Sequence, residues 1–167
     1  IPAFMSKGLS LPAGFLKSME KERAARESLQ PPYIANFEAS AALPKIKAMK
    51  DAKLPAKTVG FKPVQARPDK FVDIRSRYDG ADGLVYMRAT LSLKKAGNGF
   101  LLCGPDGPFK VWVNGTAVGS DQKCGNPALA GKYRFAATWK KGKNEIVFAL
   151  DTNGGKLWGV FAQYLLD

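Results

Sequence analysis

The stretch Gly107-Pro-Phe-Lys-Val-Trp-Val-Asn-Gly-Thr-Ala-Val-Gly119 decides the fold. In its first half a Phe and two Val residues alternate with larger or more polar ones, which is the period of a strand with two different faces. Asn114-Gly115 then predicts a tight type I′ turn, because both residues accept positive φ angles, and a returning strand starts at Thr116. Upstream, the apolar run Phe100–Cys103 ends at a second turn, Gly104–Gly107. The sequence therefore predicts a β-meander of three strands.

Short apolar or alternating runs continue on both sides of this meander, separated by turns rich in Gly and Asn. The expected strands are Tyr33–Ala39, Phe71–Ile74, Leu84–Leu93, Tyr133–Trp139, Glu145–Leu150 and Leu157–Leu166. Strands of this length and spacing are typical of an antiparallel β-sandwich. The expected fold class is therefore all-β.

The first third of the chain has a different character. Pro12–Leu29 is predicted to be a helix, since Pro suits the first turn, good helix formers follow, and Pro31-Pro32 ends it. Residues 43–62 form a connection rich in Lys and Pro, either a cationic patch for a polyanion or a solvated loop. We expect an N-terminal helical extension over residues 1–32 and a β-sandwich domain over residues 33–167.

The charge balance is strongly basic. The chain carries 26 Lys and Arg against 14 Asp and Glu, a formal net charge of +12. Such a surface attracts polyanions in general, or serves solubility alone. No apolar run approaches the roughly 20 residues that cross a bilayer, so no membrane span is expected. Ile1–Lys7 lack the features of a signal peptide, and a start at Ile indicates a mature product or an excised piece.

The residue types available limit the chemistry. Histidine is absent, which removes the commonest general base and metal ligand. Cys103 and Cys124 alone cannot make a tetrahedral zinc site. They form a disulfide across the meander, which would imply an oxidising compartment, or remain two buried thiols. No Walker-type phosphate loop occurs. We therefore expect a protein that is not an enzyme.

Four segments of the second half carry a resemblance to a known family. They are Leu84-Val-Tyr-Met-Arg-Ala-Thr-Leu91, the hairpin stretch quoted above, Trp139-Lys-Lys-Gly-Lys-Asn-Glu-Ile146 and Trp158-Gly-Val-Phe-Ala162. Together they resemble galactose-binding-like jelly-roll sandwiches. These occur as accessory domains of secreted polysaccharide-degrading enzymes and as the sugar-binding domain of β-galactosidase- and β-glucuronidase-type glycosidases. The resemblance covers about half the chain and implies a jelly roll that is secreted or periplasmic.

The resemblance also implies site residues. In the glycosidase versions an acidic residue after the Asn-Gly hairpin approaches the sugar, and Asp121 occupies the matching place. Some related jelly rolls hold a structural calcium between an early Glu and a late Asp, which Glu38 and Asp167 match. No cofactor is otherwise required.

A sugar site needs an aromatic plate for the apolar face of the ring and polar groups for its hydroxyls. Trp112 shares a strand face with Lys110 and Asn114, which offers a plate, a cation and an amide together. Trp158 lies between glycines in a loop, where its indole would be exposed, and Asp106 lies in a Gly-rich turn. The alternatives are core packing for either Trp and a turn-forming role for Asp106 or Asp121.

The function expected from the sequence is a non-catalytic carbohydrate-binding accessory domain directed to an acidic polysaccharide. The alternative is a structural sandwich that braces a neighbouring glycan-degrading catalytic domain, and this alternative predicts that both Trp112 and Trp158 are buried. A nucleic-acid partner is disfavoured, because the lysine-rich segment contains few interleaved aromatic residues.

Overall fold

A computed structural model describes residues 11–167, and this part of the chain contains two compact units that meet between Pro31 and Pro32. The first unit holds α1 (Phe15–Leu29), and the second, Pro32–Asp167, holds every strand. No helix among the described residues is long and apolar enough to cross a membrane.

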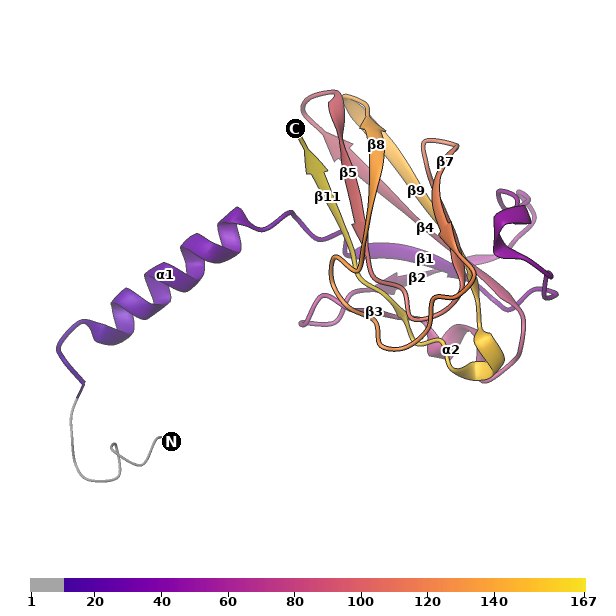
Figure 1. Cartoon of the computed structure of the whole chain (residues 1–167), viewed down its shortest axis with the longest axis horizontal. Coiled ribbons are helices and arrows are strands. Elements are labelled where there is room, and N and C mark those ends of the chain that lie inside the picture. Colours follow the sequence, from indigo (N-terminus) through magenta and orange to yellow (C-terminus); the bar gives the residue numbers. More distant parts are fainter. Residues whose placement is uncertain (1–10) are drawn as a thin grey trace. The chain divides into compact units, whose positions relative to one another are not determined.

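The second unit is an all-β sandwich of antiparallel sheets (Figure 1). The larger sheet has the order β2-β1-β4-β9-β6-β7. Its strands are β1 (Asn36–Ser40), β2 (Phe61–Gln65), β4 (Leu84–Leu93), β6 (Phe109–Val113), β7 (Thr116–Asp121) and β9 (Gly142–Asp151). The facing sheet has the order β11-β5-β8 and consists of β5 (Gly97–Cys103), β8 (Tyr133–Trp139) and β11 (Ala162–Leu166).

Short elements complete one end of the sandwich and one face of the larger sheet. A two-stranded sheet pairs β3 (Val72–Asp73) with β10 (Gly159–Val160). The remaining elements are α2 (Arg75–Tyr78) and two 3-10 turns, η2 (Met49–Asp51) and η3 (Asn153–Gly155).

The hairpin at the centre of the sequence forms as predicted, but the meander does not. Asn114 and Gly115 have φ angles of 51° and 79°, as a type I′ turn requires, and β6 pairs with β7. The upstream strand β5, however, belongs to the other sheet. The segment Gly104–Gly107 is therefore a crossing between sheets and not a hairpin turn. It is fixed to the three-stranded side, since Gly104 donates its N–H to the Phe161 carbonyl.

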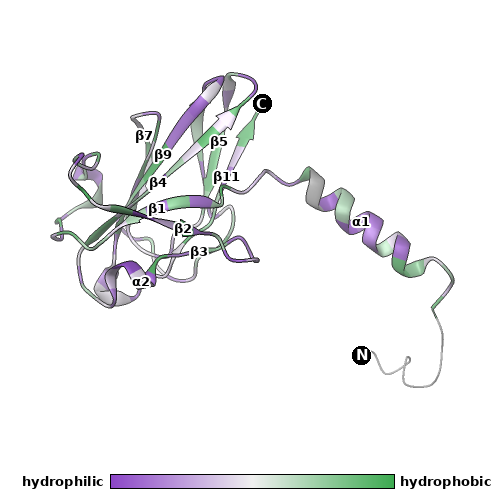
Figure 2. Ribbon diagram, turned by 180° about the vertical axis from the view of Figure 1, so that it is seen from behind, coloured by the Kyte–Doolittle hydropathy of each residue, from purple (hydrophilic) through white to green (hydrophobic). Residues whose placement is uncertain are grey.

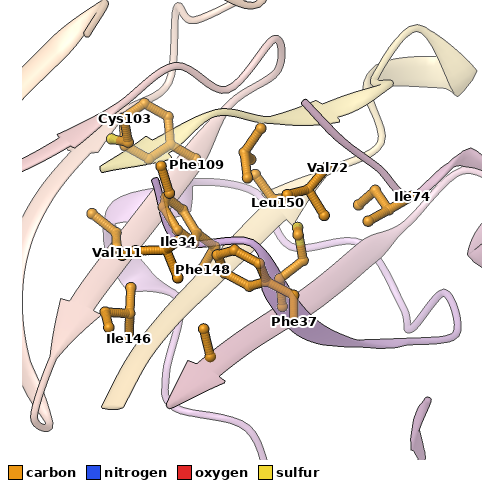
Figure 3. Packing of buried hydrophobic residues seen from close by; sticks show 14 of the residues in the cluster. Ile34, Phe37, Val72, Ile74, Cys103, Phe109, Val111, Ile146, Phe148 and Leu150 are labelled. Carbon is orange, nitrogen blue, oxygen red and sulfur yellow. The ribbon is translucent and has the colours of Figure 1, made fainter. Parts of the chain in front are cut away.

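The main core lies between the two sheets. Figure 3 shows Phe37, Phe109 and Phe148 packed with Val111 and with the aliphatic residues Ile146 and Leu150 of β9. These side chains are buried, with Phe109, Phe148 and Ile146 fully so. In Figure 2 hydrophobic and hydrophilic residues share the strands, as expected where one face is buried and the other is wet.

A second core covers the outer face of the larger sheet. Val147 and Ala149 of β9 point away from the first core and are also buried. They pack with Trp112, under Met49 and Ala52 of the lysine-rich connection. The continuous apolar run of β9 follows from this arrangement, because both of its faces are covered.

Candidate functional site

A hollow of about 530 Å³ opens at the end of the sandwich where β3, β10 and several loops meet. It is lined by aromatic, amide and charged side chains that come from distant parts of the sequence. These residues are Arg67, Phe71, Asp106, Asn126, Pro127, Ala128, Lys156, Trp158 and Phe161. We call this hollow the loop pocket. A concave site with an apolar lining and a few placed polar groups is the usual form of a small-ligand site.

The aromatic part of the loop pocket combines two buried or half-buried rings with one exposed indole. Phe71 and Phe161 lie with ring centroids 5.2 Å apart. Trp158 is 46% exposed, which is unusual for so large an apolar side chain. The Arg75 guanidinium lies 3.7 Å from its ring centroid. Arg75 itself does not line the pocket.

Asp106 positions the residues around it. Its carboxylate is buried and accepts the backbone N–H of Trp158 at 3.0 Å and that of Gly159 at 3.1 Å. It also accepts the side-chain amide of Asn126 at 3.0 Å. Because both carboxylate oxygens accept these donors, Asp106 holds two lining residues, Asn126 and Trp158, in place.

Lys132 fixes the loop that carries Asn126. Lys132 donates from Nζ to the carbonyl of Gly125 at 2.7 Å and to that of Pro127 at 3.0 Å, on either side of Asn126. The Asn126 amide in turn donates to the Lys156 carbonyl at 3.1 Å. The amide is therefore fixed at the pocket wall by contacts from three segments.

The charges of the loop pocket are nearly balanced. Arg67 forms an ion pair with Asp69 at 2.7 Å, and its hydrogen bond lowers the pKa of that carboxyl. Arg75, which lies outside the lining, forms a second pair with Asp73 at 2.6 Å. Lys156 is exposed and forms no ion pair within residues 11–167. It is the cation of the lining that remains available to a ligand.

Of the sugar-site residues expected from the sequence, the structure brings Asp106 and Trp158 together in this pocket. Trp112 lies elsewhere and is 5% exposed, because the connection around Met49 covers it. The expectation that its indole forms an open plate is therefore wrong. Lys110 beside it donates to the carbonyls of Lys50 and Ala52 at 2.7 and 2.9 Å, which fastens the covering segment to β6.

Asn114 and Asp121 are also engaged in structural contacts. The Asn114 amide donates to Asn144 Oδ1 at 2.9 Å and its oxygen accepts the Glu145 N–H at 2.9 Å, so it ties the hairpin to β9. Asp121 accepts the Tyr133 hydroxyl at 2.6 Å, which joins the edge of the larger sheet to β8. Neither residue lines the loop pocket.

The hydrogen bond from Tyr133, followed by that from the Lys123 N–H, lowers the pKa of Asp121, so its stabilising effect depends on pH. Removing the hydroxyl by Tyr133→Phe is expected to lower the free energy of unfolding by about 1 kcal/mol above about pH 4, where Asp121 is ionised in the unfolded chain too. The difference should shrink as the pH falls through the lower folded pKa of Asp121. Urea unfolding of both proteins across this range tests this. A difference that is the same at every pH would contradict it.

The expected calcium pair is not assembled. Glu38 lies on β1 and accepts a hydrogen bond from Arg88 at 2.6 Å, whereas Asp167 follows β11 in the other sheet. No group of three or more His, Cys, Asp or Glu suited to a metal occurs in the described part of the chain. The Glu38 carboxylate is paired with Arg88 instead.

Of the two alternatives for the cysteines, a disulfide or two buried thiols, the structure has the second. Cys103 and Cys124 are both free thiols and both buried. Cys124 donates to the Pro105 carbonyl at 3.2 Å. Burial raises the pKa of Cys103 well above its usual range, so this thiol stays protonated at neutral pH.

Most of the loop pocket was not identified from the sequence. Arg67, Phe71, Asn126 and Lys156 come from three connections that meet only in the folded chain. The available signals were weak and local: a Gly-Asn-Pro run at 125–127 and an Asn-Gly-Gly-Lys run at 153–156. Both mark loops, but neither indicates which loops lie together.

No protein-family model matches the chain, and no curated protein matches it. Solved structures are similar. The chain matches a β-glucuronidase of Faecalibacterium prausnitzii with 17% identity and a TM-score of 0.48, over 74% of this chain and 21% of the enzyme. It matches the PA14 domain of the antifreeze protein MpAFP with 12% identity and a TM-score of 0.47, over 80% of each chain. A family 35 carbohydrate-binding module of Clostridium thermocellum matches with 14% identity and a TM-score of 0.40, over 81% of this chain and 95% of the module. This chain spans about a fifth of the glucuronidase's length.

Proposed function

We propose that this chain is a non-catalytic carbohydrate-binding accessory domain of the galactose-binding-like jelly-roll type. In this proposal it serves a secreted or periplasmic glycan-degrading enzyme and binds an acidic polysaccharide. The observation that carries the proposal is the exposed indole of Trp158 in the loop pocket, beside the fixed amide of Asn126 and the unpaired Lys156.

These three groups correspond to the three parts of an acidic sugar. A pyranose ring has an apolar face, which stacks on an indole, and hydroxyl groups at its rim, which exchange hydrogen bonds with an amide. A uronate adds a carboxylate that a lysine ammonium attracts. Because Asp106 holds the backbone of Trp158 and the amide of Asn126 before any ligand arrives, little ordering is left to be done on binding.

The proposed role requires no chemistry. Asp106 is a carboxylate of the lining, and its oxygens already accept two backbone N–H groups and one amide. Binding the polymer would instead raise the local concentration of a linked enzyme on its substrate.

The test is affinity electrophoresis of the whole chain through gels that contain polygalacturonate, alginate or a neutral glucan. We expect retardation by the two uronate polymers, stronger at low salt, and weaker or no retardation by the neutral one. Unchanged mobility in every gel would overturn the proposal.

A bracing domain is the second candidate, and the burial of Trp112 favours it. A purely structural sandwich has no need of an open aromatic surface, and the larger sheet has its outer face covered by the connection around Met49. The exposure of Trp158 does not fit this candidate, which predicts that both indoles are buried. Retardation in the uronate gels would therefore separate the two.

A further inference from the structure

Five lysines gather at one end of the sandwich, four of them on two turns that are neighbours in space and the fifth, Lys143, at the start of β9. We call Lys94, Lys95, Lys140, Lys141 and Lys143 the lysine tip. One turn leads from β4 to β5 and the other from β8 to β9, so each crosses between the two sheets at the same end (Figure 1). The strand register places them side by side, because Leu93 pairs with Gly142 and Gly97 pairs with Trp139.

The lysine tip is a positive surface without compensating partners. All five side chains are exposed, and none forms an ion pair with another residue of the range 11–167. Two carboxylates occur near this end, Glu145 on β9 and Asp167 after β11. The lysines outnumber them, so the end of the molecule has a net positive charge that attracts anions.

Hollows adjoin these lysines. One of about 520 Å³ lies between the sheets and is lined in part by Asn98, Thr116 and Thr138. A second, of about 430 Å³, lies beside Lys143, and the two share Asn114 and Lys140 in their lining. Amide and hydroxyl groups therefore stand next to the cations, which suits a ligand that carries both hydroxyl and anionic groups.

The two ends of the sandwich differ in how many of their cations are unpaired. At the loop pocket Arg67 is paired with Asp69, and Lys156 is the cation left over. At the lysine tip five cations are unpaired. β9 joins the two ends, and its ten residues span about 33 Å at about 3.3 Å per residue.

We propose that the lysine tip is a second binding surface, which holds the carboxylate or sulfate groups of an acidic polysaccharide. The loop pocket then binds one sugar with its carboxylate at Lys156, and the lysine tip strengthens the preference for an acidic polymer by holding further anionic groups. This inference rests on the proposed function. A polysaccharide is favoured over a membrane or a nucleic acid because the large exposed hydrophobic side chains of the sandwich, residues 32–167, are Leu54, Leu129 and Trp158, and none of them lies at this end to insert into lipid or stack on bases.

The test compares two variants that lose equal charge. The tip variant carries Lys94→Ser, Lys95→Ser, Lys140→Ser and Lys141→Ser. The control carries the same change at Lys47, Lys50, Lys53 and Lys57, which are exposed in the connection. The probes are polygalacturonate, dextran sulfate, double-stranded DNA and a neutral glucan, each measured at two salt concentrations.

We expect the tip variant to bind polygalacturonate or dextran sulfate at least about tenfold more weakly at low salt, with a smaller salt dependence, and the control to lose about threefold or less. The polymer whose affinity falls more in the tip variant identifies the anionic group that the tip binds, a carboxylate for polygalacturonate or a sulfate for dextran sulfate. Equal losses in both variants, or no loss in the tip variant, would overturn the inference. So would an equal or larger loss for DNA, which would indicate a nucleic-acid surface.

The loop pocket gives a separate readout. Trp158→Ala tests the proposed function through the neutral glucan and the uronate polymers, whereas the tip variant should leave any binding of the neutral glucan unchanged. Loss of polyanion binding in the tip variant together with no effect of Trp158→Ala would retain the lysine tip and reject the loop pocket. Loss of binding in Trp158→Ala together with no effect of the tip variant would retain the loop pocket and reject the lysine tip.

Discussion

Replacing Trp158 by alanine is expected to weaken binding of the acidic polysaccharide about thirtyfold while leaving the fold intact. Central aromatic residues of binding sites typically contribute about 2 kcal/mol or more, and 2 kcal/mol corresponds to about thirtyfold in the dissociation constant. The loss of the contact with Arg75 should cost stability no more than about 1 kcal/mol, because both side chains are partly in water.

Isothermal titration with oligogalacturonates measures the affinity, and urea unfolding measures the stability. The matched control is Leu54→Ala, which removes an apolar side chain of similar exposure, 43%, from outside the loop pocket. It should change neither quantity by more than a small amount. Equal affinities of the Trp158→Ala protein and the unchanged chain would remove the loop pocket as the sugar site.

The sequence was sufficient to predict elements that depend on neighbouring residues. The hairpin at Asn114-Gly115 follows from the backbone preference of two adjacent residues, and the structure confirms it. The same kind of evidence failed at Gly104–Gly107. Turn-forming residues indicate that a chain changes direction, but they do not determine whether the next strand joins the same sheet.

The misplaced indole of Trp112 has a different cause. Strand alternation correctly puts Trp112 on the face opposite to Phe109 and Val111, that is, away from the main core. Whether that outer face is wet depends on a segment about sixty residues earlier, the connection around Met49. This connection has no apolar period of its own, so its docking on the sheet is a tertiary effect that local patterns do not reveal.

The contact between Asp106 and Trp158 is another tertiary effect that local sequence patterns do not reveal. Each residue is a candidate for the sugar site for a local reason, because it lies in a glycine-flanked turn. Fifty-two positions of sequence separate the two. Their contact arises because the crossing between sheets places Asp106 beneath the Trp158 loop. The neighbours Arg67 and Lys156 have no local signal beyond their charge, so the sequence alone does not indicate that they line a site.

Replacing Asp106 by alanine is expected to lower the free energy of unfolding by about 3 to 5 kcal/mol, the largest effect on stability predicted here. The carboxylate is 3% exposed. Its removal leaves the N–H groups of Trp158 and Gly159 and the amide of Asn126 without their acceptor. A buried donor that loses its partner costs about 1 to 3 kcal/mol, and the effects of neighbouring donors are not fully additive.

Asp106→Asn removes the negative charge but keeps one hydrogen-bond acceptor. The amide is similar in size and keeps one oxygen for the backbone N–H groups, but its NH₂ group faces donors, so we expect a loss of about 1 to 3 kcal/mol. Urea unfolding followed by tryptophan fluorescence measures both variants, with Asp51→Ala, an exposed carboxylate outside the loop pocket, as the control. If Asp106→Ala unfolded at the same urea concentration as the control, the carboxylate would not hold the loop pocket together. If Asp106→Ala lost the most stability and Asp106→Asn lost less, the loops around the loop pocket would be positioned by one buried anion.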